Sequence, residues 1–153
     1  MSEIDQFDRQ IIATLAVDGR MSVTELADRI GLSKTPTTQR LKRLERDGYI
    51  TGYQAQLNYE LLGEAHVVFV QVSLQDTSEK ALRAFNQAVA KLVAVEQCHM
   101  IAGNFDYLLK VRTRDIRAYR TVLGEQIASL PHVAHTSTFV SMETVCERQK
   151  AKL

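Results

Sequence analysis

Residues 22–46 read SVTELADRIGLSKTPTTQRLKRLER, and this stretch decides the fold of the first third of the chain. Ser22 and Glu25 form the S-x-x-E pattern of a capping box, in which two side chains satisfy free amide groups at a helix start. Gly31 ends that helix, because glycine tolerates the left-handed conformation that a helix end needs. Ser33 can cap a following helix. Two helices joined by a short turn that contains glycine are typical of a helix-turn-helix motif.

The second of these helices has a basic outer face. Residues 33–46 contain five basic side chains and one acidic side chain. At about 100° per residue, Leu41 and Leu44 define the buried direction, and the opposite side carries hydroxyl, amide and cationic groups. Those groups suit base edges and phosphates. The residues predicted to bind double-stranded DNA are Ser33, Lys34, Thr35, Thr38, Gln39, Lys42, Arg43 and Arg46. The alternative is a solvated face on a three-helix packing unit, which is the commoner meaning of a charge run.

Apolar spacing extends the motif toward the N-terminus. Apolar residues recur at helical spacing from Ile4 to Leu15, and residues 18–20 read as a turn. We therefore expect residues 1–50 to form a DNA-binding domain of the helix-turn-helix, winged-helix-like type. Residues 51–62 are rich in strand formers and predict a tether strand or linker. The first strand of the next sheet is the alternative for that stretch.

The rest of the chain, residues 63–153, alternates between strand and helix patterns and is predicted to form a second domain. Apolar runs predict strands at residues 65–74, 95–101, 107–112 and 133–142. Helical spacing predicts helices at 82–92 and 115–130. The order βαββαβ is that of a ferredoxin-like α+β sandwich. Two helices leave one face of a four-stranded sheet partly uncovered, so we expect this domain to self-associate.

Composition indicates a soluble, globular, cytoplasmic protein. The chain has 153 residues, of which 45% are hydrophobic and 24% charged, and its formal net charge is +1. No apolar run approaches the roughly 18 residues that a membrane-spanning helix needs. The acidic, polar N-terminus does not resemble a secretory signal. Cys98 and Cys146 are isolated, which predicts reduced thiols in the cytoplasm.

Motifs for catalysis and metal binding are missing from the sequence. Cys98-His99, His132 and His135 lack the CxxC or HxxxH spacing of a structural zinc site. The sequence also lacks a P-loop, a dinucleotide fingerprint and a nucleophile elbow. We therefore expect no catalytic residue, no metal and no cofactor, and we interpret the protein as a non-enzyme.

Motifs in both domains resemble the leucine-responsive regulator/asparagine regulator (feast/famine) family of bacteria and archaea, and they occur in the family's order. The residues that carry the resemblance are 4–9, 18–20, 31–33, 35–36, 40–45, 48–50, 103–110, 118–120 and 130–131. The resemblance implies a transcriptional regulator that forms dimers through its C-terminal sheets. It also implies assembly into octamers or related discs, with an amino-acid effector bound between dimers in the C-terminal domain.

The resemblance further implies an effector site around a Gly-x-Phe/Tyr-Asp turn and the final strand. The residues carried over are Met100, Gly103, Asn104, Phe105, Asp106, Ile116, Thr136, Thr138, Phe139, Val140 and Ser141. A zwitterion needs an anion for its ammonium group, which Asp106 could supply, and N–H or hydroxyl donors for its carboxylate. Taken without the resemblance, residues 103–106 read as a plain hairpin turn. Asn104 and Ser141 depart from the residues of the family's leucine-responsive member, which leaves the amino acid open.

The predicted function is sequence-specific DNA binding by a transcriptional regulator of amino-acid metabolism, modulated by a small amino acid. An architectural DNA-organising protein is one alternative, and it predicts DNA binding that no amino acid alters. A small-molecule-binding enzyme or sensor with an accessory helical domain is the other. It predicts amino-acid binding without salt-dependent DNA affinity.

Overall fold

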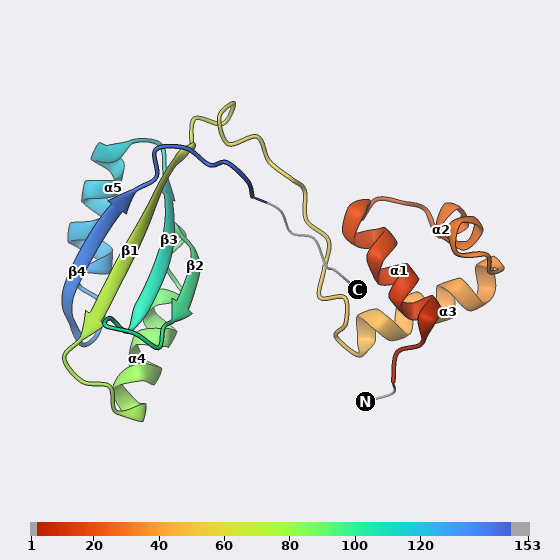
Figure 1. Ribbon diagram of the computed structural model, residues 1–153, viewed down its shortest axis with the longest axis horizontal. Coiled ribbons are helices and arrows are strands. Elements are labelled where there is room, and N and C mark those ends of the chain that lie inside the picture. The colour runs from red at the N-terminus through yellow and green to blue at the C-terminus, as the bar shows by residue number, and fades with distance from the viewer. Residues whose placement is uncertain (1–2, 148–153) are drawn as a thin grey trace. The chain divides into compact units, whose positions relative to one another are not determined.

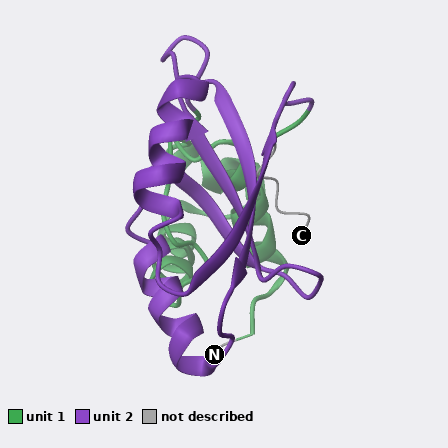
Figure 2. Cartoon of the chain, turned by 90° about the vertical axis from the view of Figure 1, so that its left-hand side faces the viewer, with its two compact units in different colours: residues 1–56, 146–153 green, residues 57–145 purple. Residues whose placement is uncertain are grey.

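The computed structural model describes residues 3–147, which fall into two compact units. The first, here called the helical unit, extends to Gln56, and the second, the sheet unit, spans Leu57–Val145 (Figure 2). Among the described residues, no helix is long and apolar enough to cross a membrane.

The helical unit contains the predicted helix-turn-helix. Its helices are α1 (Gln6–Val17), α2 (Val23–Ile30) and α3 (Lys34–Arg46). At the start of α2, the Glu25 N–H donates to the Ser22 hydroxyl at 3.2 Å, and the Ser22 N–H donates to the Glu25 carboxylate at 2.9 Å. Gly31 ends α2 with a φ of 74°, a left-handed conformation that glycine adopts without strain. The predicted capping box and glycine stop are both confirmed.

The start of α3 differs from the prediction. Ser33 occupies the N-cap position, but its side chain makes no capping hydrogen bond, so the predicted side-chain cap is wrong. The fully buried Thr37 hydroxyl instead donates to the Ser33 carbonyl oxygen at 2.9 Å. The first turn of α3 is therefore fastened by Thr37, and Ser33, Lys34 and Thr35 are all exposed.

A small apolar core joins the three helices. Ile11 of α1, Leu26 of α2 and Leu44 of α3 are each fully buried and lie in one cluster. Burying an aliphatic side chain of this size contributes about 1.5–3 kcal/mol. The buried Leu44 fixes which side of α3 faces inward, as the helical spacing predicted.

Residues 51–62 form no strand, so both the predicted tether strand and the alternative of a first sheet strand there are wrong. Tyr53 instead fastens this segment to the helical unit, where its hydroxyl donates to the Glu45 carboxylate at 2.9 Å. Its ring lies against Gly19, where an added Cβ would come within 3.2 Å of the Tyr53 ring. Desolvation raises the pKa of Tyr53 to about 12, and the hydrogen bond to Glu45 adds to the shift.

The sheet unit has the order βαββαβ. Its strands are β1 (His66–Leu74), β2 (Val95–Met100), β3 (Tyr107–Thr113) and β4 (Val133–Val140). Its helices are α4 (Glu79–Val89) and α5 (Ile116–Val122), and a π-helical turn at Leu123–Ile127 continues α5. The strands pair antiparallel in the order β2-β3-β1-β4 (Figure 1). This is the ferredoxin-like arrangement, so the predicted fold class is confirmed.

The two helices of the sheet unit lie on one face of the sheet (Figure 2). Val68 and Val72 of β1 point toward that face and are fully buried with Phe85 of α4. The alternate residue Phe69 points to the opposite face and is 37% exposed. It pairs across strands with Phe139 of β4, which is 51% exposed. The uncovered face of the sheet therefore presents an aromatic pair to solvent.

Candidate nucleic-acid interface and effector site

The outer side of α3 displays most of the residues predicted to bind DNA. The exposed ones are Ser33, Lys34, Thr35, Gln39, Lys42 and Arg46. Thr38 and Arg43 are half-buried. The Thr38 hydroxyl donates to the Lys34 carbonyl oxygen at 2.8 Å within the helix. The exposed surface thus joins hydroxyl and amide groups near the N-terminal end of α3 to cations further along the helix.

The cations on α3 have different surroundings. Among the described residues, Lys42 has no ion-pair partner. The Nε atom of Arg46 lies 2.9 Å from a carboxylate oxygen of Asp47, and the Arg46 side chain is 72% exposed while that of Asp47 is 22% exposed. Exposed pairs of this kind are worth about 0–1 kcal/mol and exchange readily for another anion. Lys42 is therefore available to phosphates, and Arg46 could exchange its pair with Asp47 for a phosphate.

Arg40 and Arg43 turn instead toward α1, where two carboxylates lie. The Arg40 guanidinium donates to Asp5 at 2.7 Å and to Asp8 at 2.9 Å. Arg43 donates to the other carboxylate oxygen of Asp8, whose side chain is fully buried. The helical wheel placed Arg43 beside Lys42 on the outer face, whereas its side chain is 32% exposed and bends back to α1.

The same carboxylates also cap α1. The Asp8 N–H donates to Asp5 at 2.9 Å, and the Asp5 N–H donates to Asp8 at 3.1 Å. The hydrogen bond from the Asp8 N–H lowers the pKa of the Asp5 carboxyl below its usual value, and Arg40 lowers it further. The hydrogen bonds to Asp5 and Asp8 in turn raise the pKa of Arg40. Sequence reasoning missed this cluster, although D-x-x-D before an apolar run is a variant of the capping-box pattern.

In the sheet unit, the predicted effector turn is tied to β1. The Leu74 N–H donates to a carboxylate oxygen of Asp106 at 2.7 Å. The Asp106 N–H donates to the Val72 carbonyl oxygen at 3.0 Å. Asp106 therefore fastens the turn to the end of β1 with one carboxylate oxygen, a role that no local pattern in the sequence predicts.

The predicted effector residues are spread along the sheet. Thr136 lies opposite Val72, near the Gly103–Asp106 turn, whereas Val140 lies opposite Val68. Four residues of strand separate these positions, or roughly 13 Å. Thr138 lies between them, and its hydroxyl is 2.6 Å from the Tyr119 hydroxyl. A single chain does not bring the whole set together in one cavity.

Several of the predicted effector residues are exposed apolar side chains. Met100 is 60% exposed, Ile116 is 53% exposed and Val140 is 47% exposed. Gly103 and Asn104 are also exposed, whereas Phe105, Asp106 and Ser141 are half-buried. Exposed apolar side chains at these positions are typical of surfaces that a partner covers.

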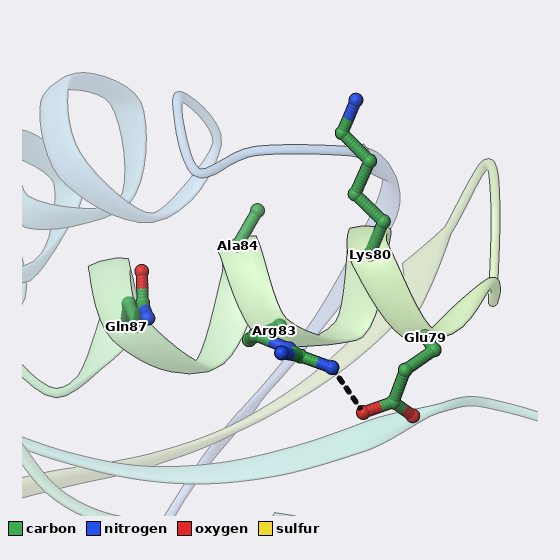
Figure 3. A pocket seen from close by; sticks show the side chains of 5 residues that line it. All are labelled: Glu79, Lys80, Arg83, Ala84 and Gln87. Atoms are coloured by element: carbon green, nitrogen blue, oxygen red, sulfur yellow. Dashed lines mark hydrogen bonds and ion pairs between the residues drawn. The ribbon is translucent and has the colours of Figure 1, made fainter.

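A separate hollow lies on the outer side of α4 (Figure 3). It is lined by Glu79, Lys80, Arg83, Ala84 and Gln87. Arg83 and Glu79 form an exposed ion pair at 3.0 Å across one helical turn. None of these residues belongs to the predicted effector set, so the hollow is separate from that site.

The cysteines and histidines form no cluster in the part of the chain that the structure describes. Cys98 is half-buried and Cys146 is exposed, and both are free thiols. Burial raises the pKa of the Cys98 thiol, which keeps it protonated at neutral pH. Within residues 3–147, no three metal-ligating side chains come together.

A helix-turn-helix with a basic outer helix, joined to a ferredoxin-like domain, defines a DNA-binding regulator with a ligand-binding domain. Residues 4–51 match the family model for winged helix-turn-helix DNA-binding, and residues 67–151 match that for the Lrp/AsnC ligand binding domain. The chain belongs to the Lrp/AsnC family of transcriptional regulators, which are not enzymes.

Curated relatives match almost the whole chain. A proline dehydrogenase transcriptional activator from Rhizobium radiobacter is 60% identical over 95% of this chain and 93% of its own length. A protein of the same name from Rhodobacter capsulatus is 51% identical over 98% and 97%. The leucine-responsive regulatory protein of Escherichia coli K12 is 46% identical over 94% of this chain and 87% of its own length.

Solved structures share the architecture. A transcriptional regulator from Neisseria meningitidis in complex with L-Met superposes with a TM-score of 0.89 at 27% identity, covering 97% of this chain and 96% of its own. A feast or famine regulatory protein from M. tuberculosis complexed with L-methionine gives 0.88 at 31% identity, covering 97% and 99%. Both likenesses extend over the helical unit and the sheet unit.

Proposed function

We propose that the outer side of α3 reads double-stranded DNA in the cytoplasm, and that an amino acid bound to the sheet unit changes this binding. The observation that supports the proposal most directly is the side chains exposed on α3. Thr35 and Gln39 offer a hydroxyl and an amide near the helix N-terminus, which is the end that usually enters the major groove. Lys42 and Arg46 supply cations further along, where phosphates lie.

The target we propose is an operator upstream of a proline dehydrogenase gene. The support is the 60% identity to the activator from Rhizobium radiobacter, together with the exposed reading surface of α3. In the same proposal, the effector is a small amino acid, as in the neighbouring structures with L-methionine. The candidates to compare are proline, leucine and methionine.

We further propose that the effector site is completed by a second copy of the chain. The predicted effector residues extend over roughly 13 Å of one sheet, which is too far for a single small zwitterion to touch from end to end. Exposed Met100, Ile116 and Val140 would be covered in such an assembly. The exposed Phe69–Phe139 pair supports a dimer formed through the open face of the sheet, with dimers assembling to octamers or similar discs.

A mobility-shift assay tests this function. Full-length protein is titrated onto DNA from its own upstream region and from upstream of a proline dehydrogenase gene, with unrelated DNA as the control. Each titration is repeated with proline, leucine, methionine or no amino acid. The proposal expects binding to at least one upstream region and a shift caused by one amino acid. Binding that no amino acid alters would instead support an architectural DNA-organising protein.

A further inference from the structure

The carboxylate of Asp8 lies at the centre of a charge cluster that joins α1 to α3. Its side chain is fully buried, and it accepts hydrogen bonds from the Asp5 N–H, from Arg40 and from Arg43. Asp5 supplies the second carboxylate, which also binds Arg40. The cluster therefore holds two acidic and two basic side chains, and its formal charges cancel.

This pairing changes the charge that α3 presents to DNA. A buried carboxylate without its cationic partners is strongly disfavoured, so the guanidinium groups cannot leave Asp8 without a large cost. A phosphate that drew either guanidinium away from α1 would have to compete with an anion that is already desolvated. An exposed lysine faces no such competition, and Lys42 is the neighbour of Arg43 in the chain.

We propose that Asp8 is a positioning residue for DNA recognition, which holds Arg43 and Arg40 on α1 so that they make no phosphate contact. The proposal rests on DNA reading by α3. Two consequences follow from it. The angle of α3 against α1 is set by the cluster, and the phosphate-binding charge of α3 comes from Lys42 and the other exposed cations rather than from Arg43.

The salt dependence of DNA affinity tests this proposal, because its slope counts phosphate contacts. Each contact contributes about 0.9 to the slope of log affinity against log salt concentration. The variants Lys42→Ala, Arg43→Ala and Asp8→Asn are compared with the parent on one operator and on unrelated DNA of equal length. Circular dichroism of each variant verifies that the helical unit is folded.

Lys42→Ala should lower the slope by about one unit, and Arg43→Ala should leave it within about 0.3 of the parent. Asp8→Asn frees a guanidinium, so it should raise the slope by about one unit and tighten binding to unrelated DNA at low salt. A purely structural role for Asp8 predicts weaker binding with an unchanged slope. The double variant D8N/R43Q removes both charges and should restore the parental slope.

A drop of about one unit in Arg43→Ala would overturn the proposal, since it would make Arg43 a phosphate contact. If Asp8→Asn does not fold, the proposal is tested by the slopes of Arg43→Ala and D8N/R43Q, which should both equal the parental slope. The Lys42→Ala variant distinguishes failure of the positioning role of Asp8 from failure of DNA reading by α3. If Lys42→Ala and the parent give the same affinity and slope, α3 does not read DNA. If Lys42→Ala and Arg43→Ala both lower the slope, α3 reads DNA but the positioning role of Asp8 is wrong.

Discussion

The Leu74 N–H donates to the Asp106 carboxylate at 2.7 Å, so the residue predicted to hold an effector also fastens the end of β1. One carboxylate oxygen is occupied by this bond. The second oxygen is the one that a ligand's ammonium group would use. A substitution at Asp106 therefore affects two properties that have to be measured separately.

Asp106→Asn should weaken amino-acid binding while leaving the fold intact. The asparagine carbonyl can still accept the Leu74 N–H, but it lacks the charge that an ammonium group needs. Losing a charge-assisted contact costs about 1.5–3 kcal/mol, or roughly a ten- to hundredfold loss of affinity. Calorimetry of the full chain with the effector found in the mobility-shift assay measures this loss.

Asp106→Ala is the structural comparison, since it also removes the acceptor for Leu74 and should lower the free energy of unfolding by about 1–3 kcal/mol. If Asp106→Asn binds the effector as the parent does, residues 103–106 are only a turn.

Gln39→Ala should relax sequence preference. Gln39 is exposed near the start of α3, and a glutamine amide can pair with both hydrogen-bonding groups of adenine in the major groove. Its loss should cost roughly 1–3 kcal/mol at one base position in each half-site and little elsewhere. Binding-site selection with parent and variant measures the change. An identical consensus from both proteins would remove Gln39 from the reading surface.

Phe69→Glu should break the proposed dimer. Phe69 and Phe139 lie opposite each other on the uncovered face of the sheet. In a dimer formed through this face, the introduced carboxylate would be buried without a partner, which is strongly disfavoured. We expect a shift to monomers in sedimentation experiments, with an unchanged circular dichroism spectrum. Val93→Glu is the matched control, because Val93 is an apolar residue of the same unit that is 98% exposed and lies outside the strands. Parental sedimentation of Phe69→Glu would place the interface on another surface.

Ser22→Ala and Ser33→Ala form a pair that tests the caps of α2 and α3. The Ser22 hydroxyl accepts the Glu25 N–H, whereas the Ser33 side chain makes no capping hydrogen bond. Ser22→Ala should therefore lower the free energy of unfolding by about 0.5–2 kcal/mol, and Ser33→Ala should change it by less than about 0.5 kcal/mol. Urea unfolding of both variants measures the difference. Equal losses would mean that the two serines cap alike in solution.

Local patterns in the sequence predicted the parts of the fold that depend on neighbouring residues. The capping box at Ser22, the stop at Gly31 and the order of strands and helices all follow from short-range geometry and apolar spacing. Element ends were less well predicted. The last strand ends at Val140 rather than Met142, although the Ser141 N–H still donates to the Val67 carbonyl oxygen at 2.9 Å.

The candidate site was harder to predict because its key contacts join residues that are far apart in the sequence. Asp8 and Arg43 are 35 positions apart. Helical periodicity predicts which side of one helix is buried, but it does not predict contacts between two helices. The wheel therefore placed Arg43 among the exposed cations. The double role of Asp106 has the same origin, since its partner Leu74 is 32 positions away. The effector residues came from a family resemblance, which names positions but does not say which copy of the chain supplies each.

The central place of β1 has a consequence for the order in which the protein folds during synthesis. β1 pairs with β4, and Val68 lies opposite Val140, which leaves the ribosome 72 residues later. The helices α1 to α3, by contrast, complete their core within the first fifty residues. Contacts close in sequence form sooner than distant ones, and domains fold N-terminal first during translation. The helical unit therefore folds before β4 has been synthesised. A nascent chain that stops before β4 exposes an unpaired edge of β1, which favours aggregation.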